Sequence, residues 1–375
     1  MIKDFVDIYE KRHEYAKAWK EKNPDKKVMG YMCSYFPEEI FYAGGILPVR
    51  ILGSHQPQNV TEPYIFGMYC PFSRDVLAQG LLGRYDYIDA VGTAYPCMHL
   101  GQAFDSWTMH VTQKSFYIDM PNRVQSPLSL PFLTGRLEET KREVEEWIGR
   151  EITHADLQDA IDIYNENRSL LRQIYMTRKA DDVPLTGTEC MYITAANLFM
   201  DKKEANALLK DTIEKELTGR KVKSADDTRL MIVGSENDDI GFMNMVEEFK
   251  AVIVMDDHCT GSRYFWNPVE PQENLIQAIA QRQIDRPICP QRDYPERRRL
   301  PYLLHLAQEW RVKGVIILQQ KFCDPHELDK VAIIDWFKEH GIDTLYLELD
   351  VTVPLGPFKI RVEALLETLR EDDIW

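Results

Sequence analysis

Short apolar runs alternate with amphipathic segments along most of this chain. In the first third, each apolar run has the length of a buried strand, and the residues between runs place apolar side chains at helical spacing. The predicted strands lie at 27–32, 46–52, 87–94 and 115–118. Strands that alternate with helices in this way are typical of a parallel sheet with helices on its faces.

The pattern becomes helical and strongly charged in the middle of the chain and then returns to alternation. Helices are predicted at 138–147, 157–176, 191–199 and 202–217, and later strands at 230–233, 251–255, 315–318 and 343–349. The Pro-, Arg- and Gln-rich segment from Cys259 to Pro301 contains no predicted element. The sequence therefore predicts an α/β protein with two parallel-sheet domains of flavodoxin or Rossmann type (1–132 and 225–375), joined by a helical section (133–224).

Composition limits the functions that this fold can serve. The 375 residues carry a formal net charge of −15, which repels phosphate and argues against nucleic-acid binding. No apolar run approaches the ~20 residues of a membrane helix, and the N-terminal residues lack the apolar centre of a signal peptide. We therefore expect a cytoplasmic protein without nucleic-acid or membrane partners.

The cysteines are the side chains of this chain that could carry the most kinds of chemistry. The seven cysteines are Cys33, Cys70, Cys97, Cys190, Cys259, Cys289 and Cys323. An odd number without signs of secretion disfavours a disulfide framework, and the Cys/His spacing of a zinc ribbon is absent. Any metal site must gather cysteines from distant segments, and buried free thiols are the alternative.

Three cysteines stand where predicted helices begin. Cys323 follows a strand and is followed by Asp324, a good helix cap, and Pro325, which suits a first turn. Cys70 and Cys97 also precede predicted helices. The positive end of a helix should lower the pKa of such thiols and favour the metal-binding thiolate. Because ligands collect beyond the carboxyl ends of parallel strands, the three could hold an iron–sulfur cluster between the two halves.

Two other kinds of site receive less support. No GxxxxGK[ST] motif is present, and no GxGxxG motif follows a strand, so neither a P-loop nor a Rossmann dinucleotide site is expected. Thiol nucleophilic catalysis stays open for Cys97 with His99 and for Cys323 with His326. Otherwise these two histidines are expected on helix surfaces. A further strand-end cluster in the second half contains Ser235, Asp256, Cys323 and Glu348.

Several segments carry a family resemblance. They are Cys33-Ser-Tyr-Phe-Pro37-Glu-Glu-Ile, Ala43-Gly-Gly-Ile-Leu-Pro48-Val, Ile163-Tyr-Asn-Glu-Asn-Arg168, Lys321-Phe-Cys-Asp-Pro325 and Tyr346-Leu-Glu-Leu-Asp350. The residues of these segments, their order and their spacing resemble those of the 2-hydroxyacyl-CoA dehydratase and benzoyl-CoA reductase family over nearly the whole chain. Arg50-Ile-Leu-Gly-Ser-His and Tyr69-Cys-Pro-Phe-Ser-Arg74 are most similar to the smaller, cluster-binding subunit of ATP-dependent (class I) benzoyl-CoA reductase.

The resemblance implies a specific function. It implies one [4Fe–4S] cluster in the cleft between the domains, held by Cys70, Cys97 and Cys323. It also implies a paralogous acyl-CoA-binding subunit and a separate ATP-dependent activator that donates electrons, in agreement with the missing P-loop. The expected protein is the iron–sulfur subunit of a benzoyl-CoA reductase in anaerobic aromatic degradation, an oxidoreductase that passes low-potential electrons to an aromatic acyl-CoA.

Alternatives remain within and outside that family. One is the β-type subunit of a 2-hydroxyacyl-CoA dehydratase, a lyase that acts through a ketyl radical. Cys259 and Cys289 lie outside the three-cysteine pattern, and Cys33 is a spare thiol or an extra ligand; six or more ligating cysteines would indicate a double-cubane cluster of a related ATP-dependent reductase. A cluster-free structural partner subunit is a further option. Candidates for a general acid are His99, His258, His326 and Glu348.

Overall fold

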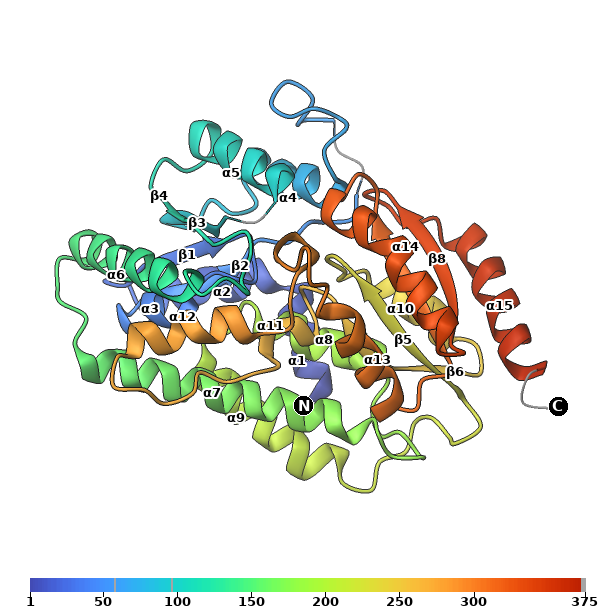
Figure 1. The fold of residues 1–375 in the computed structure, drawn as a ribbon. Coiled ribbons are helices and arrows are strands. Elements are labelled where there is room, and N and C mark those ends of the chain that lie inside the picture. The colour runs from blue at the N-terminus through green and yellow to red at the C-terminus, as the bar shows by residue number, and fades with distance from the viewer. Residues whose placement is uncertain (57–58, 96, 372–375) are drawn as a thin grey trace.

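Two four-stranded parallel sheets organise the computed structural model, which describes residues 1–56, 59–95 and 97–371 (Figure 1). Pro96, which the sequence places before Cys97, lies outside these ranges. The first sheet has the order β2-β1-β3-β4 and contains β1 (Val28–Tyr31), β2 (Leu47–Arg50), β3 (Ala90–Ala94) and β4 (Ser115–Ile118). The second has the order β6-β5-β7-β8 and contains β5 (Thr228–Gly234), β6 (Ala251–Asp257), β7 (Gly314–Gln320) and β8 (Asp343–Leu349). The predicted fold of two parallel-sheet domains is confirmed.

Both sheets repeat the same topology. In each, the first strand lies between the second and the third, and all neighbours run parallel. The strands β1, β2, β3, β5, β6 and β7 are buried along nearly their whole lengths, as expected where helices cover both faces of a parallel sheet. The order reverses between β1 and β3 and between β5 and β7, which creates one switch point in each sheet.

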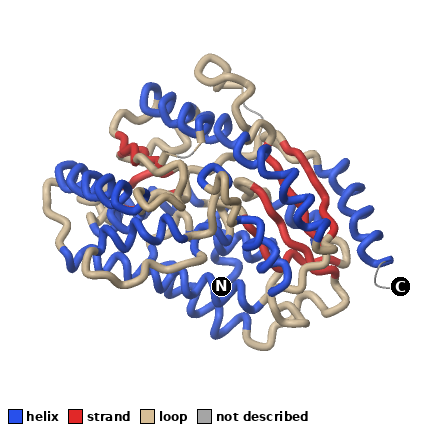
Figure 2. Tube along the Cα trace, viewed as in Figure 1, coloured by secondary structure: helices blue, strands red, loops and turns tan. Residues whose placement is uncertain are grey.

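Helices surround the two sheets and separate them in space, as the tube in Figure 2 makes plain. The first half contains α1 (Ile2–Glu10), α2 (Arg12–Lys22), α3 (Glu38–Ala43), α4 (Pro71–Leu81) and α5 (Met98–His110). The second contains α10 (Ile240–Glu247), α11 (Ser262–Phe265), α12 (Leu275–Asp285), the 3₁₀ turn η2 (Pro290–Arg292), α13 (Arg299–Glu309), α14 (Asp324–Glu339) and α15 (Leu355–Glu371). Helices α1 and α2 follow one another with a break at Lys11.

The helical section is built from long helices with strong caps. It contains α6 (Ser129–Ile148), α7 (His154–Thr177), α8 (Gly187–Asn197) and α9 (Lys202–Thr212), which runs on into the π turn η1 (Ile213–Leu217). Thr153 and Thr186 each cap a helix through a reciprocal capping box. In Figure 1, α7 and α9 lie along the lower edge of the molecule, and the first sheet lies to the upper left of the second.

Helix α12 corrects the expectation that the segment before Pro301 contains no element. Leu275, Ile276 and Ile279 are buried, and the Asn274 side chain caps the helix by accepting the backbone N–H of Gln277. The apolar spacing is helical, but Pro, Arg and Gln in the flanking sequence obscure it. The helix packs against α6 of the helical section. The boundaries at 132 and 224 stay a prediction.

No helix within the described ranges has the length and apolar character needed to cross a bilayer.

A buried ion pair joins the helical section to the first half. The Arg168 guanidinium of α7 donates to the Glu39 carboxylate of α3, and both side chains are almost fully buried. Burial alone would raise the pKa of Glu39, but Arg168 and Arg282 outweigh it, so the pKa is lowered and the carboxylate stays charged.

Replacing Glu39 with Gln should therefore destabilise the protein by about 3–5 kcal/mol, because Arg168 would be left buried without a counter-charge. Urea unfolding measures the change. Asp182→Asn is the matched control, since it removes the partner of Lys221 in an exposed ion pair and should have a much smaller effect on stability. Equal effects of the two substitutions would contradict this assignment.

Candidate functional site

One cavity collects six of the seven cysteines. The thiols that line it belong to Cys33, Cys70, Cys97, Cys259, Cys289 and Cys323. The cavity and its open mouth together span about 650 Å³. The seventh cysteine, Cys190 of α8, packs in the hydrophobic core.

The duplicated topology explains why these segments meet. Ligands of open parallel sheets bind beyond the carboxyl ends of the strands, where the strand order reverses. At the first switch point, Cys33 follows β1 and Cys97 follows β3; at the second, Glu236 follows β5 and Cys323 follows β7. Side chains from both switch points line the same cavity. The two sheets therefore present equivalent ends to one site.

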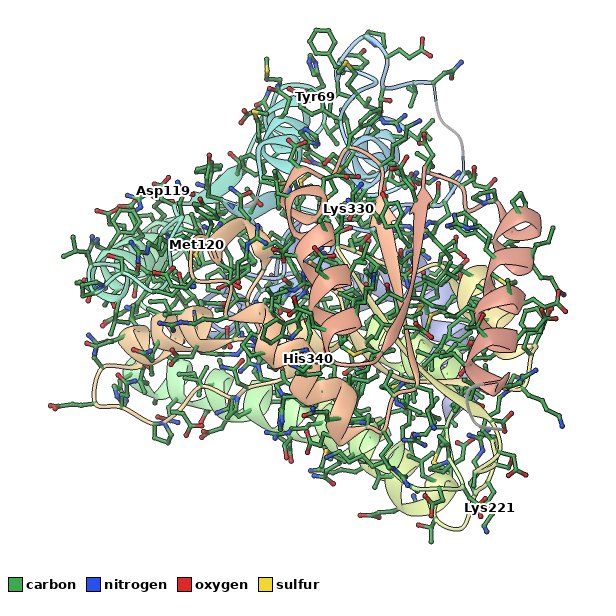
Figure 3. All side chains as sticks on the ribbon, turned by 45° about the vertical axis from the view of Figure 1, so that its right-hand side comes forward. Tyr69, Asp119, Met120, Lys221, Lys330 and His340 are labelled. Atoms are coloured by element: carbon green, nitrogen blue, oxygen red, sulfur yellow. The ribbon has the colours of Figure 1, made fainter. Side chains whose placement is uncertain are left out.

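The three cysteines singled out by sequence form the first trio of this cavity. Cys70, Cys97 and Cys323 are the residues directly before α4, α5 and α14. They also line a smaller hollow that the other three cysteines do not reach. In Figure 3, Tyr69, the neighbour of Cys70, lies beyond the amino end of α14, along which Lys330 precedes His340. The structure brings these three thiols together; their role as ligands stays a prediction.

The expected lowering of the thiol pKa values is wrong for the protein by itself. Burial raises the pKa of Cys323 well above its usual value, and the neighbouring Cys70 and Cys97 thiols add to the effect. Burial also raises the pKa of Cys97 and of Cys70, although a hydrogen bond with the Ser73 hydroxyl at 3.1 Å opposes it for Cys70. Desolvation outweighs the helix ends, so these thiols stay protonated until a cationic centre replaces their protons.

A second trio occupies the same cavity: Cys33, which the sequence offered as a spare thiol or an extra ligand, and Cys259 and Cys289, which lie outside the predicted three-cysteine pattern. Cys33 follows β1, Cys259 follows β6, and Cys289 precedes the turn η2. Burial and the Cys259 thiol raise the pKa of Cys289 to about 11, while Arg263 opposes the shift. Burial likewise raises the pKa of Cys33, against the effect of Arg50. Cys259 and Cys289 lie in loops that carry no local signature, so only the fold reveals them.

His99 connects the first trio across the two halves. Its Nδ1 accepts the backbone N–H of Cys70 at 3.2 Å, and its Nε2 lies 3.4 Å from the carboxylate of Asp324. The histidine is buried, which corrects the expected surface position, and Asp324 pairs with it rather than capping α14. Because Nδ1 accepts, the ring proton belongs on Nε2, toward Asp324.

The remaining acid candidates differ in position. His326 is buried on the cavity wall, against expectation, and burial lowers its pKa well below the usual value. His258 is buried beside the Thr260 hydroxyl at 3.1 Å. Glu348 is exposed and accepts the hydroxyl of Tyr346 at 3.0 Å, outside the cavity lining.

The strand-end cluster of the second half therefore divides. Ser235 and Cys323 line the cavity, whereas Asp256 and Glu348 do not. Asp256 is occupied elsewhere, since it accepts the hydroxyl of Tyr175 at 2.6 Å.

Three charged side chains on the cavity wall were missed as site residues: Glu236, Arg50 and Arg292. Glu236 is buried, and neither carboxyl oxygen has a hydrogen-bond partner among the described residues. Burial, together with the Asp238 carboxylate, raises the pKa of Glu236 well above its usual value. Its position one residue past Ser235, at a strand end, was a usable signal. Arg50 stands at the end of β2.

The donor set of the cavity consists of thiols, the side chains that an iron–sulfur cluster requires as ligands. Over the part of the chain that the structure describes, no three His, Cys, Asp or Glu side chains are arranged to hold one metal ion. A cluster spans several irons and sulfides, so its ligands stand farther apart than those of one ion, and it requires thiolates. Six thiols around one cavity, of which Cys70 and Cys323 are buried and the others half-buried, meet that chemical requirement.

The fold and the site thus define a two-sheet α/β protein with a buried thiol cavity. The model of the family "2-hydroxyglutaryl-CoA dehydratase, D-component" matches residues 33–369, so the chain belongs to this family and the expected membership is confirmed.

Relatives with assigned names match along most of their length. A subunit of the benzoyl-CoA reductase of Thauera aromatica is 28% identical over 336 residues, which cover 87% of this chain and 86% of that one. The (R)-phenyllactyl-CoA dehydratase beta subunit of Clostridium sporogenes is 26% identical over 368 residues, 98% of each chain. The beta subunit of (R)-2-hydroxyglutaryl-CoA dehydratase of Acidaminococcus fermentans is 25% identical over 358 residues, 93% of this chain and 94% of that one.

The raised thiol pKa values make the metal-free protein sensitive to alkali. A thiol whose pKa is higher in the folded state contributes fully below its unfolded pKa of about 8.5, and the contribution is lost as the pH rises through the folded value. For Cys289, with a folded pKa of about 11, the loss should be on the order of 3 kcal/mol.

Thermal unfolding of metal-free protein between pH 8 and pH 11 measures this loss. Cys289→Ala should flatten the decline in stability relative to the unsubstituted protein, because it removes one thiol that ionises only on unfolding. Parallel declines in both proteins would show that Cys289 has an ordinary pKa.

Proposed function

We propose that this chain is the iron–sulfur subunit of an ATP-dependent acyl-CoA reductase of the benzoyl-CoA reductase type. The observation that carries the proposal is the single buried cavity lined by six thiols, three of them at helix amino ends. Similarity to the benzoyl-CoA reductase relative over 87% of the chain supports the reaction class.

Cys70 and Cys97 of the first half and Cys323 of the second would hold a [4Fe–4S] cluster between them. When bound, such a cluster supplies low-potential electrons and, with three thiolates, leaves one iron open to a further ligand. The protein contributes burial: Cys70 and Cys323 are 6% and 8% exposed. Burial excludes water from the cluster. Because an added electron is then poorly solvated, burial also keeps the reduction potential of the cluster low.

The proposal requires partners, and the names of the relatives as subunits support this. The chain lacks a P-loop motif, so ATP hydrolysis would fall to a separate activator that donates electrons. A paralogous subunit would bind the acyl-CoA. A cytoplasmic location is part of the proposal, since free thiols and a low-potential cluster need a reducing compartment.

A second candidate is an ATP-dependent reductase with a double-cubane cluster. Cys33, Cys259 and Cys289 favour it, because they line the same cavity and one cluster on three thiolates would leave them without a ligand role. Two trios of thiolates match two cubanes. In this case the chain could serve a small-molecule substrate without an acyl-CoA subunit.

A third candidate is the β-type subunit of a 2-hydroxyacyl-CoA dehydratase, which two of the relatives' names support. Reductant stoichiometry separates the two acyl-CoA reactions. Dehydration is redox-neutral, so a catalytic amount of electrons suffices, whereas ring reduction consumes two electrons and two protons per product.

Cys323→Ser should remove most of the cluster. Anaerobically purified protein should contain about four irons and four sulfides per chain, or about eight irons with a double cubane, and the variant should lose most of both. Cys190→Ser is the matched control, because this buried cysteine lies outside the cavity. An unchanged iron content in Cys323→Ser would show that Cys323 is not a cluster ligand. Wild-type protein without iron would favour a cluster-free structural subunit.

Cys259→Ser separates the two cluster types. With one [4Fe–4S] cluster on the first trio, its iron content should stay at the wild-type value of about four per chain. A fall from about eight irons to half that number or less would identify the double cubane. Iron and acid-labile sulfide analysis, with electron paramagnetic resonance of the reduced protein, reads out both cases.

A further inference from the structure

Arg50 is a buried cation on the wall of the thiol cavity. It stands at the carboxyl end of β2, and its side chain is 2% exposed. Its guanidinium carbon lies 5.6 Å from the ring centre of Tyr31 and 6.0 Å from that of Phe72. The Nε and Nη1 atoms have no hydrogen-bond partner among the described residues.

A buried guanidinium without a counter-charge is energetically unfavourable. Arginine keeps its proton at every physiological pH, so it cannot become neutral as a buried lysine or carboxylic acid can. Aromatic faces recover only part of the lost hydration. A compensating negative charge is therefore expected within reach of Arg50.

The protein groups described around the cavity supply that charge only in part. Glu236, a carboxyl side chain of the lining, attracts Arg50 electrostatically, but burial and Asp238 raise the pKa of Glu236 well above its usual value. Neither of its carboxyl oxygens has a hydrogen-bond partner in the described part of the chain, so Glu236 forms no hydrogen bond with Arg50. The other arginine of the lining, Arg292, is already engaged, since it donates to the backbone carbonyls of Pro121 and Tyr95. Arg50 thus retains N–H donors for whatever occupies the cavity.

We propose that Arg50 binds the anionic atom of the molecule or cluster that occupies the thiol cavity. The inference rests on the proposed function for the identity of that anion, which is a small sulfur or oxygen atom. It comes from one of two sources: a sulfide or thiolate of the cluster, or the thioester oxygen of an acyl-CoA as negative charge develops on it. Arg50 donates N–H bonds to it and neutralises its charge.

Three variants test the proposal in anaerobically purified protein. Arg50→Gln removes the positive charge, whereas Arg50→Lys keeps the charge but offers fewer N–H donors than the guanidinium. Arg178→Gln is the matched control: Arg178 is 1% exposed, lies 4.0 Å from the Tyr175 ring centre and has unpartnered Nε and Nη2 atoms, but it does not line the cavity. It therefore reports the general effect of removing a buried guanidinium.

The two sources of the anion give different results for Arg50→Gln. If the anion belongs to the cluster, the variant should lose at least half of its iron or show a more negative midpoint potential, and Arg50→Lys should restore most of the difference. If it is the thioester oxygen, iron content and the resting resonance spectrum should match wild type, while the change in that spectrum on adding acyl-CoA is lost. The proposal would be overturned if Arg50→Gln had the same iron content, midpoint potential and spectral response to acyl-CoA as Arg178→Gln.

A cluster-free measurement keeps this test separate from the proposed function. In protein stripped of metal, sodium azide serves as a small anionic probe, and its stabilisation of wild type against thermal unfolding should require at least tenfold more azide in Arg50→Gln. This experiment applies even if the wild-type protein is purified without iron, a result that would count against the proposed function alone. Equal azide responses in wild type and Arg50→Gln would count against the role of Arg50.

Discussion

The cost of removing charge from water is the constraint on which this structure depends. Six thiols and the guanidinium of Arg50 border one buried cavity, and burial acts on them in opposite ways. Burial raises the pKa values of Cys33, Cys70, Cys97, Cys289 and Cys323, so these thiols keep their protons, and Cys323 does so despite the helix that begins beside it. The guanidinium has no such response and stays charged. An empty cavity is therefore neutral at sulfur and positive at Arg50, an arrangement suited to an anionic occupant that exchanges metal for thiol protons.

Repetition of one topology places these groups. Each sheet reverses its strand order once, and each reversal sends the residues after two neighbouring strands to the same edge. Two ion pairs then join the halves, each with the cation on the first half and the acid on the second: His55 with Asp238 and Arg74 with Asp350. His99 also lies 3.4 Å from Asp324, but burial lowers the pKa of His99, so this contact joins a neutral ring to a carboxylate. The His55 ring lies 2.6 Å from Asp238, and although burial opposes it, this carboxylate raises the pKa of His55 to about 10, so the pair stays charged at neutral pH. Complementary charge thus fixes how the two switch points meet.

The sequence predicted those parts of the molecule whose causes are local. The apolar runs predicted all eight strands of the two sheets. Pro71 and Pro325 indicated that helices begin directly after Cys70 and Cys323. Helix α12 was missed because its apolar stripe of Leu275, Ile276 and Ile279 is short and set among turn-forming residues. The site was half predicted. Cys70, Cys97 and Cys323 share a helix-entrance signal, whereas Cys259 and Cys289 reach the cavity from loops. The raised pKa values of Cys70, Cys97 and Cys323 depend on burial, a property of the assembled fold rather than of neighbouring residues.

If the chain binds the proposed cluster, metal loading and closure of the two halves should be one equilibrium. Cys70 and Cys97 belong to one half and Cys323 to the other, so a centre that uses all three adds its binding free energy to the contacts between the halves. The hydrogen bond from Cys70 to His99, and the approach of His99 to Asp324 beside Cys323, couple the same segments without metal. Binding also releases the thiol protons that burial retains, so loading becomes more favourable as pH rises while the empty protein becomes less stable. The cavity that disfavours bare thiolates is, for that reason, one in which a bound cluster would make a large contribution to holding the fold together.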